Sequence, residues 1–223
     1  MNPAGLRRFT RPATTVAAEP SADTGPALRA GEERCELCGT TLSHHHGHVV
    51  DSDKRSIVCA CRPCYLLFTA PGAAGGRYRA VPERVHHDPA HPLSTVDWES
   101  LQVPVGIAFF FRNSALDCVV ASYPSPGGAT ECELDLTEWA RLADTYPLLR
   151  MPVDDLEGIL VNRTAEGIET FLIPIDLCYA LVGEVRLRWR GLDGGDEVRQ
   201  SVAAFLADLR HRSSPLPRPP TEA

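Results

Sequence analysis

CELCGTTLSHHHGHVVDSDKRSIVCACRPC, residues 35–64, contains five of the eight cysteines and four of the eight histidines of this 223-residue chain. Thiolate and imidazole groups are the protein ligands preferred by zinc and by several transition metals. No other part of the sequence concentrates these side chains in the same way. The segment therefore predicts a small metal-bound module, around which the first part of the chain folds.

Two CxxC pairs in this segment supply a complete set of zinc ligands. Structural zinc is held by four tetrahedral ligands, and two such pairs about 20 residues apart are typical of four-cysteine sites. Gly39 directly follows the first pair and suits a turn that needs a positive φ. We expect the ligands to be Cys35, Cys38, Cys61 and Cys64. Zinc is the expected metal, with iron in a rubredoxin-like site or nickel as the alternatives.

The remaining metal-binding side chains leave other ligand sets open. Cys59 lies two residues before Cys61, and side chains two apart in an extended segment point to the same face. Cys59 or His48 could therefore replace one of the four cysteines. The histidine run that ends at His48 could also bind a second ion or pass one on, and His44 is a further candidate ligand. A solvated polar loop explains the same run without a metal.

Composition and charge narrow the class of protein. Hydrophobic residues make up 43% of the chain and charged residues 23%, which is ordinary for a globular protein. Residues 95–212 carry 19 acidic against 10 basic side chains, which argues against nucleic acid as the main partner because such binding neutralises phosphates. The sequence shows no apolar run that could span a membrane and no secretory signal, so the clustered cysteines indicate a reducing cytoplasm.

Changes in composition divide the chain into five segments. Residues 1–33 are rich in Pro, Ala and Thr without periodicity, which predicts a disordered tail. Residues 34–82 hold the metal-binding knuckle module, of zinc-ribbon or treble-clef-like type. Residues 83–97 combine histidines and prolines and are expected to form a linker. Residues 98–212 are expected to form a larger α+β domain, followed by a second disordered tail at residues 213–223.

The larger domain is expected to combine antiparallel hairpins with amphipathic helices. Runs rich in β-branched and aromatic residues predict two hairpins, residues 103–113 with 115–123 and residues 158–164 with 169–175. Apolar spacing predicts three helices: one from Asp135 or Thr137 to about Thr145, one capped by Asp176, and a C-terminal amphipathic helix, Asp196–Arg212.

Several segments of this domain are less regular in pattern. Residues 124–130 are expected to form a loop, because Pro and Gly dominate them. Residues 185–191 either continue the second helix or form a strand. The isolated cysteines, Cys118, Cys132 and Cys178, are expected in the core, where free cysteines behave as small hydrophobic residues.

The sequence offers no convincing catalytic set, and we expect no enzyme. Ser125 lacks the GxSxG context of a hydrolase nucleophile. The carboxylates of Asp154, Asp155 and Glu157 fit a charged turn or the start of a helix. The order CxxCG, histidines and CxxC is similar to treble-clef nucleases of the HNH type. Such a nuclease needs a histidine or asparagine after its second pair, whereas Cys64 is followed by Tyr, Leu, Leu and Phe.

Several stretches together resemble a known family: CELCG at 35–39, CACRPC at 59–64, VPVGIAFFFRNS at 103–114, YPSPGGATE at 123–131, LIPIDLCYALVGEVRLRWRGLDGG at 172–195, and the final amphipathic helix. In this order they resemble, over residues 34–212, an uncharacterised family of high-GC, actinobacterial-type bacteria encoded beside high-affinity nickel–iron hydrogenases. The resemblance implies a pathway and a protein partner, either a hydrogenase subunit or a maturation factor, but no assigned activity.

The residues and the resemblance together predict a non-catalytic, metal-binding accessory protein of the cytoplasm. It would support hydrogenase maturation or assembly through protein–protein contacts. The alternative is an iron- or nickel-handling protein for electron transfer or metal delivery, and a treble-clef nuclease is the third hypothesis. The colour of the purified protein separates the first two, because an iron–thiolate site is red and a zinc site is colourless.

Overall fold

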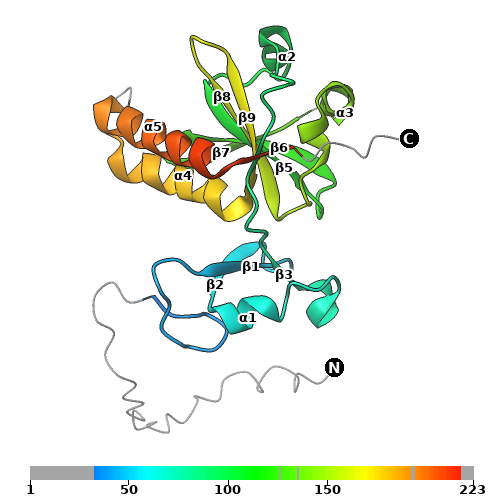
Figure 1. Ribbon diagram of the computed structural model, residues 1–223, viewed down its shortest axis with the longest axis vertical. Coiled ribbons are helices and arrows are strands. Elements are labelled where there is room, and N and C mark those ends of the chain that lie inside the picture. The colour runs from blue at the N-terminus through cyan, green and yellow to red at the C-terminus, as the bar shows by residue number, and fades with distance from the viewer. Residues whose placement is uncertain (1–32, 126, 135, 192–193, 217–223) are drawn as a thin grey trace, which may run out of the picture. The chain divides into compact units, whose positions relative to one another are not determined.

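The computed structural model describes residues 33–125, 127–134, 136–191 and 194–216 (Figure 1). The tail predicted at residues 1–33 lies outside the described residues except for Glu33. From Glu33 onward, the chain belongs to one unit by its internal contacts. Among the described residues, no helix is both long enough and apolar enough to cross a lipid bilayer.

The cysteine-rich segment and the residues that follow it fold around a small antiparallel sheet with the strand order β2-β1-β3. Its strands are β1 (Gly47–Asp51), β2 (Ser56–Ala60) and β3 (Tyr78–Ala80). Helix α1 (Arg62–Leu66) follows β2, and a short 3-10 segment, η2 (Ala73–Gly76), precedes β3. The buried carboxylate of Asp51 closes the β1–β2 turn, because it accepts hydrogen bonds from the N–H groups of Asp53 and Lys54, each 3.2 Å long.

A second, seven-stranded sheet has the order β10-β4-β9-β8-β5-β6-β7. Neighbouring strands are antiparallel except β10 and β4, which are parallel. The strands are β4 (His86–His87), β5 (Ile107–Asn113), β6 (Cys118–Ser125), β7 (Gly128–Glu133), β8 (Glu157–Arg163), β9 (Ile168–Pro174) and β10 (Ser214–Pro215).

Helices cover both faces of the seven-stranded sheet (Figure 1). On one face, α4 (Ile175–Arg188) and α5 (Gly195–Arg212) share a core with Phe109 and Phe111. On the other, α2 (Thr95–Ser100), α3 (Leu136–Thr145) and the 3-10 helix η3 (Pro147–Arg150) pack with Phe110. Because side chains alternate along a strand, a sheet covered on both faces buries all three phenylalanines, which explains the continuous apolar run there.

Side chains of residues 33–85 reach the core beneath α4 and α5. Val50 and Val81 belong to the same buried cluster as Phe109. Arg84 donates hydrogen bonds of 2.6 and 2.7 Å to the carboxylate of Glu157, which is completely buried. Removing one partner of a buried ion pair leaves an uncompensated charge. The Arg84–Glu157 pair therefore fixes the chain after β3 to strand β8.

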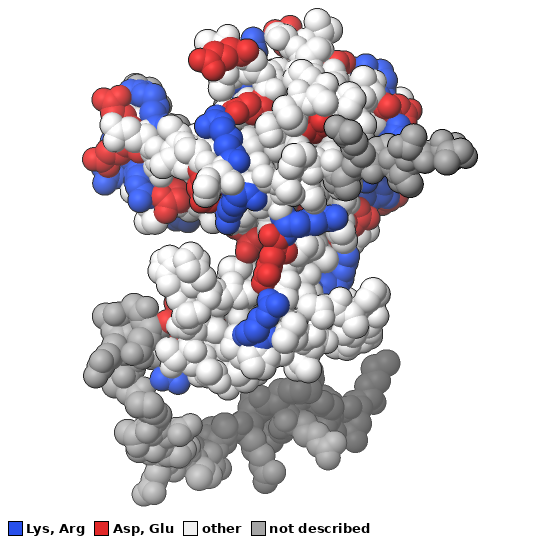
Figure 2. All heavy atoms as spheres, in the orientation of Figure 1, with Lys and Arg blue, Asp and Glu red and all other residues white. Residues whose placement is uncertain are grey.

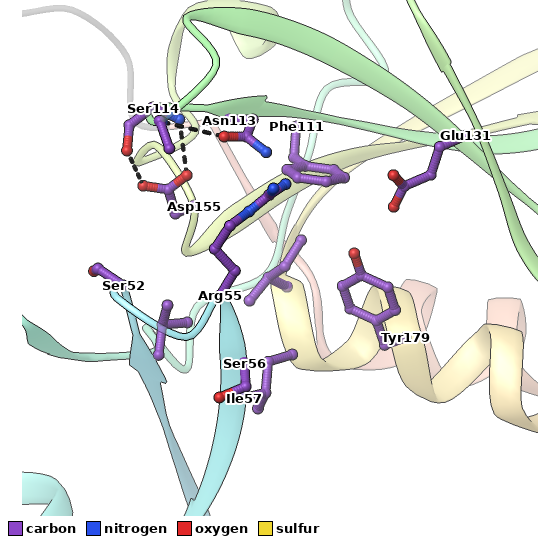
Figure 3. Close-up of a pocket in the computed structure, with 13 residues that line it drawn as sticks. Ser52, Arg55, Ser56, Ile57, Phe111, Asn113, Ser114, Glu131, Asp155 and Tyr179 are labelled. Atoms are coloured by element: carbon purple, nitrogen blue, oxygen red, sulfur yellow. Dashed lines mark hydrogen bonds between the residues drawn. The ribbon is translucent and has the colours of Figure 1, made fainter. Parts of the chain in front are cut away.

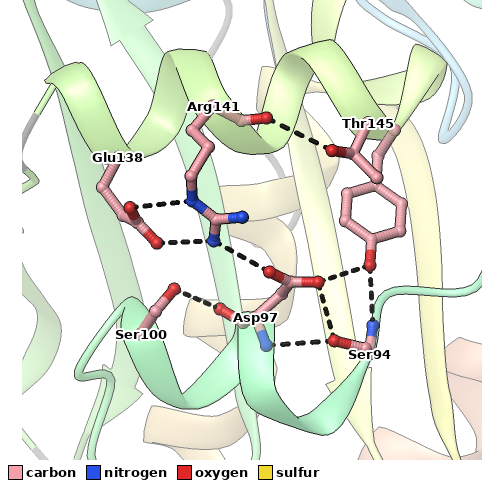
Figure 4. A network of polar contacts seen from close by, with 7 residues as sticks. Ser94, Asp97, Ser100, Glu138, Arg141 and Thr145 are labelled. Atoms are coloured by element: carbon pink, nitrogen blue, oxygen red, sulfur yellow. Dashed lines mark hydrogen bonds and ion pairs between the residues drawn. The ribbon is translucent and has the colours of Figure 1, made fainter.

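A polar network joins α2 to α3 and the residue after it (Figure 4). Arg141 donates to Asp97 at 2.8 Å and to Glu138 at 2.7 and 3.0 Å. The hydroxyl groups of Tyr146 and Ser94 donate to the same Asp97 carboxylate, at 2.6 and 2.7 Å. Hydrogen bonds from Tyr146, Ser94 and Arg141 lower the pKa of Asp97 to about 2. Each group has a partner within the network, which indicates a structural clamp.

The structure confirms the stronger secondary-structure predictions. The two predicted hairpins are β5–β6 and β8–β9, and the C-terminal helix is α5. A helix spans 136–145 as expected, while its proposed cap Asp135 lies outside the described residues. The prediction of Asp176 as a cap is wrong, because α4 begins at Ile175 with Pro174 as its N-cap. Residues 185–188 continue α4 rather than form a strand.

Three segments expected to be irregular contain strands. The predicted loop at 124–130 contributes to β6 and β7, the predicted linker contains β4, and the predicted tail at 213–223 contains β10. These strands are short or lie at a sheet edge, so few of their side chains are apolar and the sequence pattern is weak. Because β7 is an edge strand, Cys132 is exposed rather than in the core, whereas Cys178 is fully buried.

Candidate metal centre

The first CxxC pair lies on a tight turn. The N–H group of Gly39 donates to the carbonyl of Cys35 at 2.7 Å, and the N–H group of Cys35 donates to the carbonyl of Thr40 at 2.8 Å. Gly39 has a φ of +77°, the left-handed conformation expected for the position after the pair. The turn therefore brings the side chains of Cys35 and Cys38 to one side, with Cys35 buried.

The second CxxC pair lies where β2 gives way to α1. Cys61 is the N-cap of α1, with an extended φ of −68° and ψ of 158°, and Pro63 occupies the first turn of the helix. Proline is favoured there because its missing N–H group would have no helical partner. Cys64 lies three residues after Cys61, and residues three apart at a helix start lie on the same side. Local geometry thus brings the second pair together as well.

All four predicted cysteine ligands meet at one point. Their sulfur atoms lie within 4.8 Å of one another, and the Sγ atoms of Cys38 and Cys61 are 3.6 Å apart. In a tetrahedral site with the usual Zn–S distance of about 2.3 Å, the sulfur atoms are about 3.8 Å apart. The cluster therefore has the ligand types and the approximate size of a four-thiolate metal site.

The thiols of this cluster do not ionise equally without a metal. Hydrogen bonds from the side chain and backbone of Thr40 lower the pKa of Cys38 to about 6. The thiol of Cys61 acts in the opposite direction and raises the pKa of Cys64 to about 12. Four thiolates at this spacing repel one another strongly, and a bound cation removes that repulsion. The residues present therefore fit a divalent metal ion.

A second group of metal-binding side chains lies beside the first. One ring nitrogen each of His46 and His48 and the sulfur atom of Cys59 lie within 4.8 Å of one another. Burial raises the pKa of the Cys59 thiol. Cys59 lies in this second group, whereas Cys61, which follows the end of β2, lies in the four-cysteine cluster. His44, a predicted additional ligand, is exposed and packs edge-on against His45 instead.

Comparison with known protein families identifies one that this chain matches. The model of a family of unknown function, DUF5947, matches residues 34–213, which is well over half of the chain. The chain belongs to the DUF5947 family. Neither the curated proteins nor the solved structures include a significant match to it. Membership in DUF5947 agrees with the expected resemblance to an uncharacterised family, while the association with hydrogenases stays a prediction.

The DUF5947 protein also has a pocket between the β1–β2 turn, the seven-stranded sheet and α4 (Figure 3). Arg55 extends from the turn toward the sheet. Ser114 and Asp155 lie on one side of the Arg55 side chain, and Glu131 and Tyr179 lie on the other. Burial raises the pKa of Tyr179 to about 12, so its hydroxyl group stays protonated. The nearby Asp155 carboxylate accepts hydrogen bonds of 2.9 and 2.5 Å from Ser114. The hydrogen bonds between Ser114 and Asp155 join the β5–β6 turn to the chain before β8.

Two residues at the second cluster of the DUF5947 protein, His46 and Asp176, were not predicted from the sequence. His46 was one of four neighbouring histidines, and it lies just before β1, two residues from His48. Asp176 was expected to cap a helix, yet its Oδ2 atom lies 2.7 Å from Nδ1 of His48. No spacing rule connects two residues this far apart in the sequence, so this contact required the tertiary structure.

Proposed function

We propose that this DUF5947 protein is a non-catalytic binding protein whose N-terminal module is held together by Zn²⁺ at Cys35, Cys38, Cys61 and Cys64. The observation that carries the proposal is the position of the four sulfur atoms within 4.8 Å of one another. Four thiolates complete a tetrahedral zinc shell and leave no position for a substrate or an activated water. Such a site stabilises a fold and does not catalyse a reaction.

The small core of this module supports a structural role for the metal. Among the residues that the structure describes, its own buried cluster consists of Cys35, Val49, Ala60 and Tyr65. A core of this size contributes little hydrophobic stabilisation, and small modules commonly depend on a metal or on disulfides. The turn of the first pair, the β1–β2 hairpin and the start of α1 follow one another around the cluster. Of the two types predicted from the sequence, zinc-ribbon or treble-clef-like, this order supports the treble-clef-like one.

The proposed partner is a protein that binds an uncharged surface of the module. Residues 63–76 contain no charged side chain, and Leu66 and Leu67 within them are 52% and 66% exposed. Figure 2 shows that much of the viewed surface over α1 and its surroundings is uncharged, in contrast to the mixed charges over α4 and α5. Exposed leucines in an uncharged stretch suit a protein contact. A nickel–iron hydrogenase subunit or maturation factor is proposed on the sequence resemblance alone.

Metal analysis of the purified full-length chain tests the proposal. We expect tightly bound, colourless zinc by mass spectrometry, retained during gel filtration under reducing conditions. Cys64→Ser should lose this zinc, whereas Cys132→Ser should keep it because Cys132 lies on edge strand β7. A red protein containing iron, or a chain that holds no metal and keeps its fold, would contradict the structural zinc.

A further inference from the structure

We propose that His46, His48 and Cys59 form a second metal site, separate from the four-cysteine cluster, for a divalent cation of borderline softness such as Zn²⁺ or Ni²⁺. The three ligand atoms lie within 4.8 Å of one another. Two imidazoles and one thiolate are a ligand set that these cations accept. This site goes beyond the proposed structural zinc, because it has only three protein ligands and can bind and release its ion.

Strand register brings the three side chains together. His48 of β1 is directly paired with Cys59 of β2. In an antiparallel sheet, directly paired residues place their side chains on the same face, with Cβ atoms about 5 Å apart. His46 lies two residues before His48 and its ring centroid is 4.8 Å from that of His48. The β1–β2 pairing therefore places two of the three ligands, and the residue directly before β1 supplies the third.

The backbone around Cys59 is also held in place. The N–H group of Cys59 donates to Oε1 of Glu36 at 2.8 Å, and its carbonyl accepts from the N–H group of Glu36 at 3.0 Å. Glu36 lies between Cys35 and Cys38 in the first turn. The second site is consequently preorganised by the same turn that builds the first.

The hydrogen bonds of His46 leave one nitrogen available for a metal. Its Nδ1 atom lies 3.0 Å from the carbonyl oxygen of Ser43, and a carbonyl only accepts, so Nδ1 carries the proton. Nε2 then carries the free lone pair, and in the structure it is buried without a hydrogen-bond partner. A buried, unpartnered acceptor is costly in a folded protein. A metal ion bound to Nε2 would remove that cost, and a histidine held through its other nitrogen is usual for metal ligands.

Asp176 supplies a carboxylate at the edge of the site. Its Oδ2 atom lies 2.7 Å from Nδ1 of His48, although the two atoms are not aligned for a regular hydrogen bond. Its other oxygen accepts from the N–H group of Leu177 at 2.9 Å, which fixes the carboxylate in the first turn of α4. Carboxylates that contact a ligating histidine orient its ring and strengthen its binding to the metal. Asp176 thus connects the second site to α4.

The surroundings leave space for a fourth, exchangeable ligand. The site opens into a cavity of about 240 Å³ that is also lined by His44, His45, Glu83 and Arg212. Zinc sites with three protein ligands keep the fourth position for water or another small ligand. The side chain of His48 is 24% exposed, which leaves a path for an ion from the cavity to the site.

Cobalt titration of the zinc-loaded full-length chain tests this site. A mild chelator first removes weakly held metal, and Co²⁺ is then added while thiolate-to-cobalt absorption is recorded. We expect one equivalent of Co²⁺ to bind with a thiolate absorption band. The variants His46→Ala, His48→Ala and Cys59→Ser should each lose this band while retaining the zinc of the four-cysteine cluster.

Matched variants in the same loop make the result decisive. His44→Ala and His45→Ala should bind Co²⁺ as the wild type does, because both residues lie outside the cluster. Asp176→Asn should weaken binding by roughly 10- to 100-fold without changing the stoichiometry. The proposal is overturned if the zinc-loaded wild type takes up no Co²⁺, or if His44→Ala reduces binding as much as His46→Ala. If the wild type lacks zinc but still binds Co²⁺ through Cys59, the proposed structural zinc is refuted and the proposed second site is not.

Discussion

The four-cysteine cluster and the His46/His48/Cys59 cluster come from the same 30-residue segment but are assembled differently. Each pair of the first cluster lies on one local turn, and its four thiolates leave no position open. The second cluster depends on the pairing of β1 with β2 and on Asp176 from α4. The difference teaches that spacing along the chain predicts the pairs of the four-cysteine cluster, whereas the grouping of His46, His48 and Cys59 depends on strand register and a tertiary contact.

The largest effect is expected from breaking the first cluster. Structural zinc contributes on the order of 10 kcal/mol of binding free energy in small zinc peptides, and much of it stabilises the fold. Cys38→Ser should therefore lower the free energy of unfolding by at least about 3 kcal/mol, which lowers the melting temperature by roughly 6–12 °C. Scanning calorimetry measures the change, with Cys132→Ser as the control. An unchanged melting temperature after loss of zinc would show that the first cluster is not structural.

The next effect tests whether the second cluster depends on the rest of the fold. Arg84→Met leaves the buried carboxylate of Glu157 without its ion pair, which should cost about 3 kcal/mol. Because the pair fixes the chain between β3 and β8, we expect weaker Co²⁺ binding at the second cluster and unchanged zinc at the first. Urea unfolding and metal titration measure the two effects.

A surface ion pair provides the control for that experiment. Arg62 and Glu83 pair at 2.9 Å with both side chains more than half exposed. Arg62→Met should therefore change stability by less than about 1 kcal/mol. If Arg62→Met and Arg84→Met were equally destabilising, the buried junction would not have the role assigned to it.

A smaller effect is expected from crowding the start of β1. A Cβ atom on Gly47 would lie 2.6 Å from Cδ2 of the buried Tyr65 ring, so Gly47→Ala forces the strand or the ring to move. Overpacking of this kind costs about 1–3 kcal/mol. The movement should displace His46 and His48 from Cys59 and weaken Co²⁺ binding, while the four cysteines keep zinc. Isothermal titration and thermal unfolding measure these changes.

Another glycine offers a matched control. Gly183 lies inside α4 with no atom within 4 Å of an added Cβ. Gly183→Ala should leave both clusters unchanged and raise stability by up to about 1 kcal/mol, because alanine favours a helix. Equal Co²⁺ affinities in Gly47→Ala and the wild type would contradict the dependence of the second cluster on the position of β1.

The smallest effect concerns a region that neither cluster contacts. The pKa of Asp97 is lowered to about 2 in the folded protein by Tyr146, Ser94 and Arg141. Its contribution to stability is therefore complete above the unfolded pKa of about 4 and is lost as the pH falls toward 2. Asp97→Asn should remove this pH-dependent contribution to the free energy of unfolding, on the order of 1 kcal/mol. Metal binding at the two clusters should not change.

Chemical denaturation at a series of acidic pH values measures that dependence. Acid also releases metals from thiolates, so the difference between Asp97→Asn and the wild type in the same buffer isolates the network. Asp144→Asn is the control, because Asp144 is 80% exposed and pairs only at the surface with Arg150. A wild type and an Asp97→Asn variant with the same pH dependence would show that this network does not stabilise the fold in acid.

Much of the fold could be predicted from sequence because its central elements bury large side chains. The runs that became β5, β8 and β9 are rich in apolar residues, and their hairpins followed from that pattern. β4, β7 and β10 were missed because short or edge strands obtain their pairing from neighbours rather than from their own hydrophobicity.

For the metal sites, the sequence by itself determined which side chains could bind an ion and which four cysteines form pairs, because turn geometry depends on near neighbours. Only the tertiary structure decided that Cys59 lies with His48 rather than with Cys61, because this grouping depends on where β2 ends and α1 begins. It also decided that Asp176 lies against His48. Contacts between residues far apart in the chain depend on how whole layers pack, and local spacing carries no record of that packing.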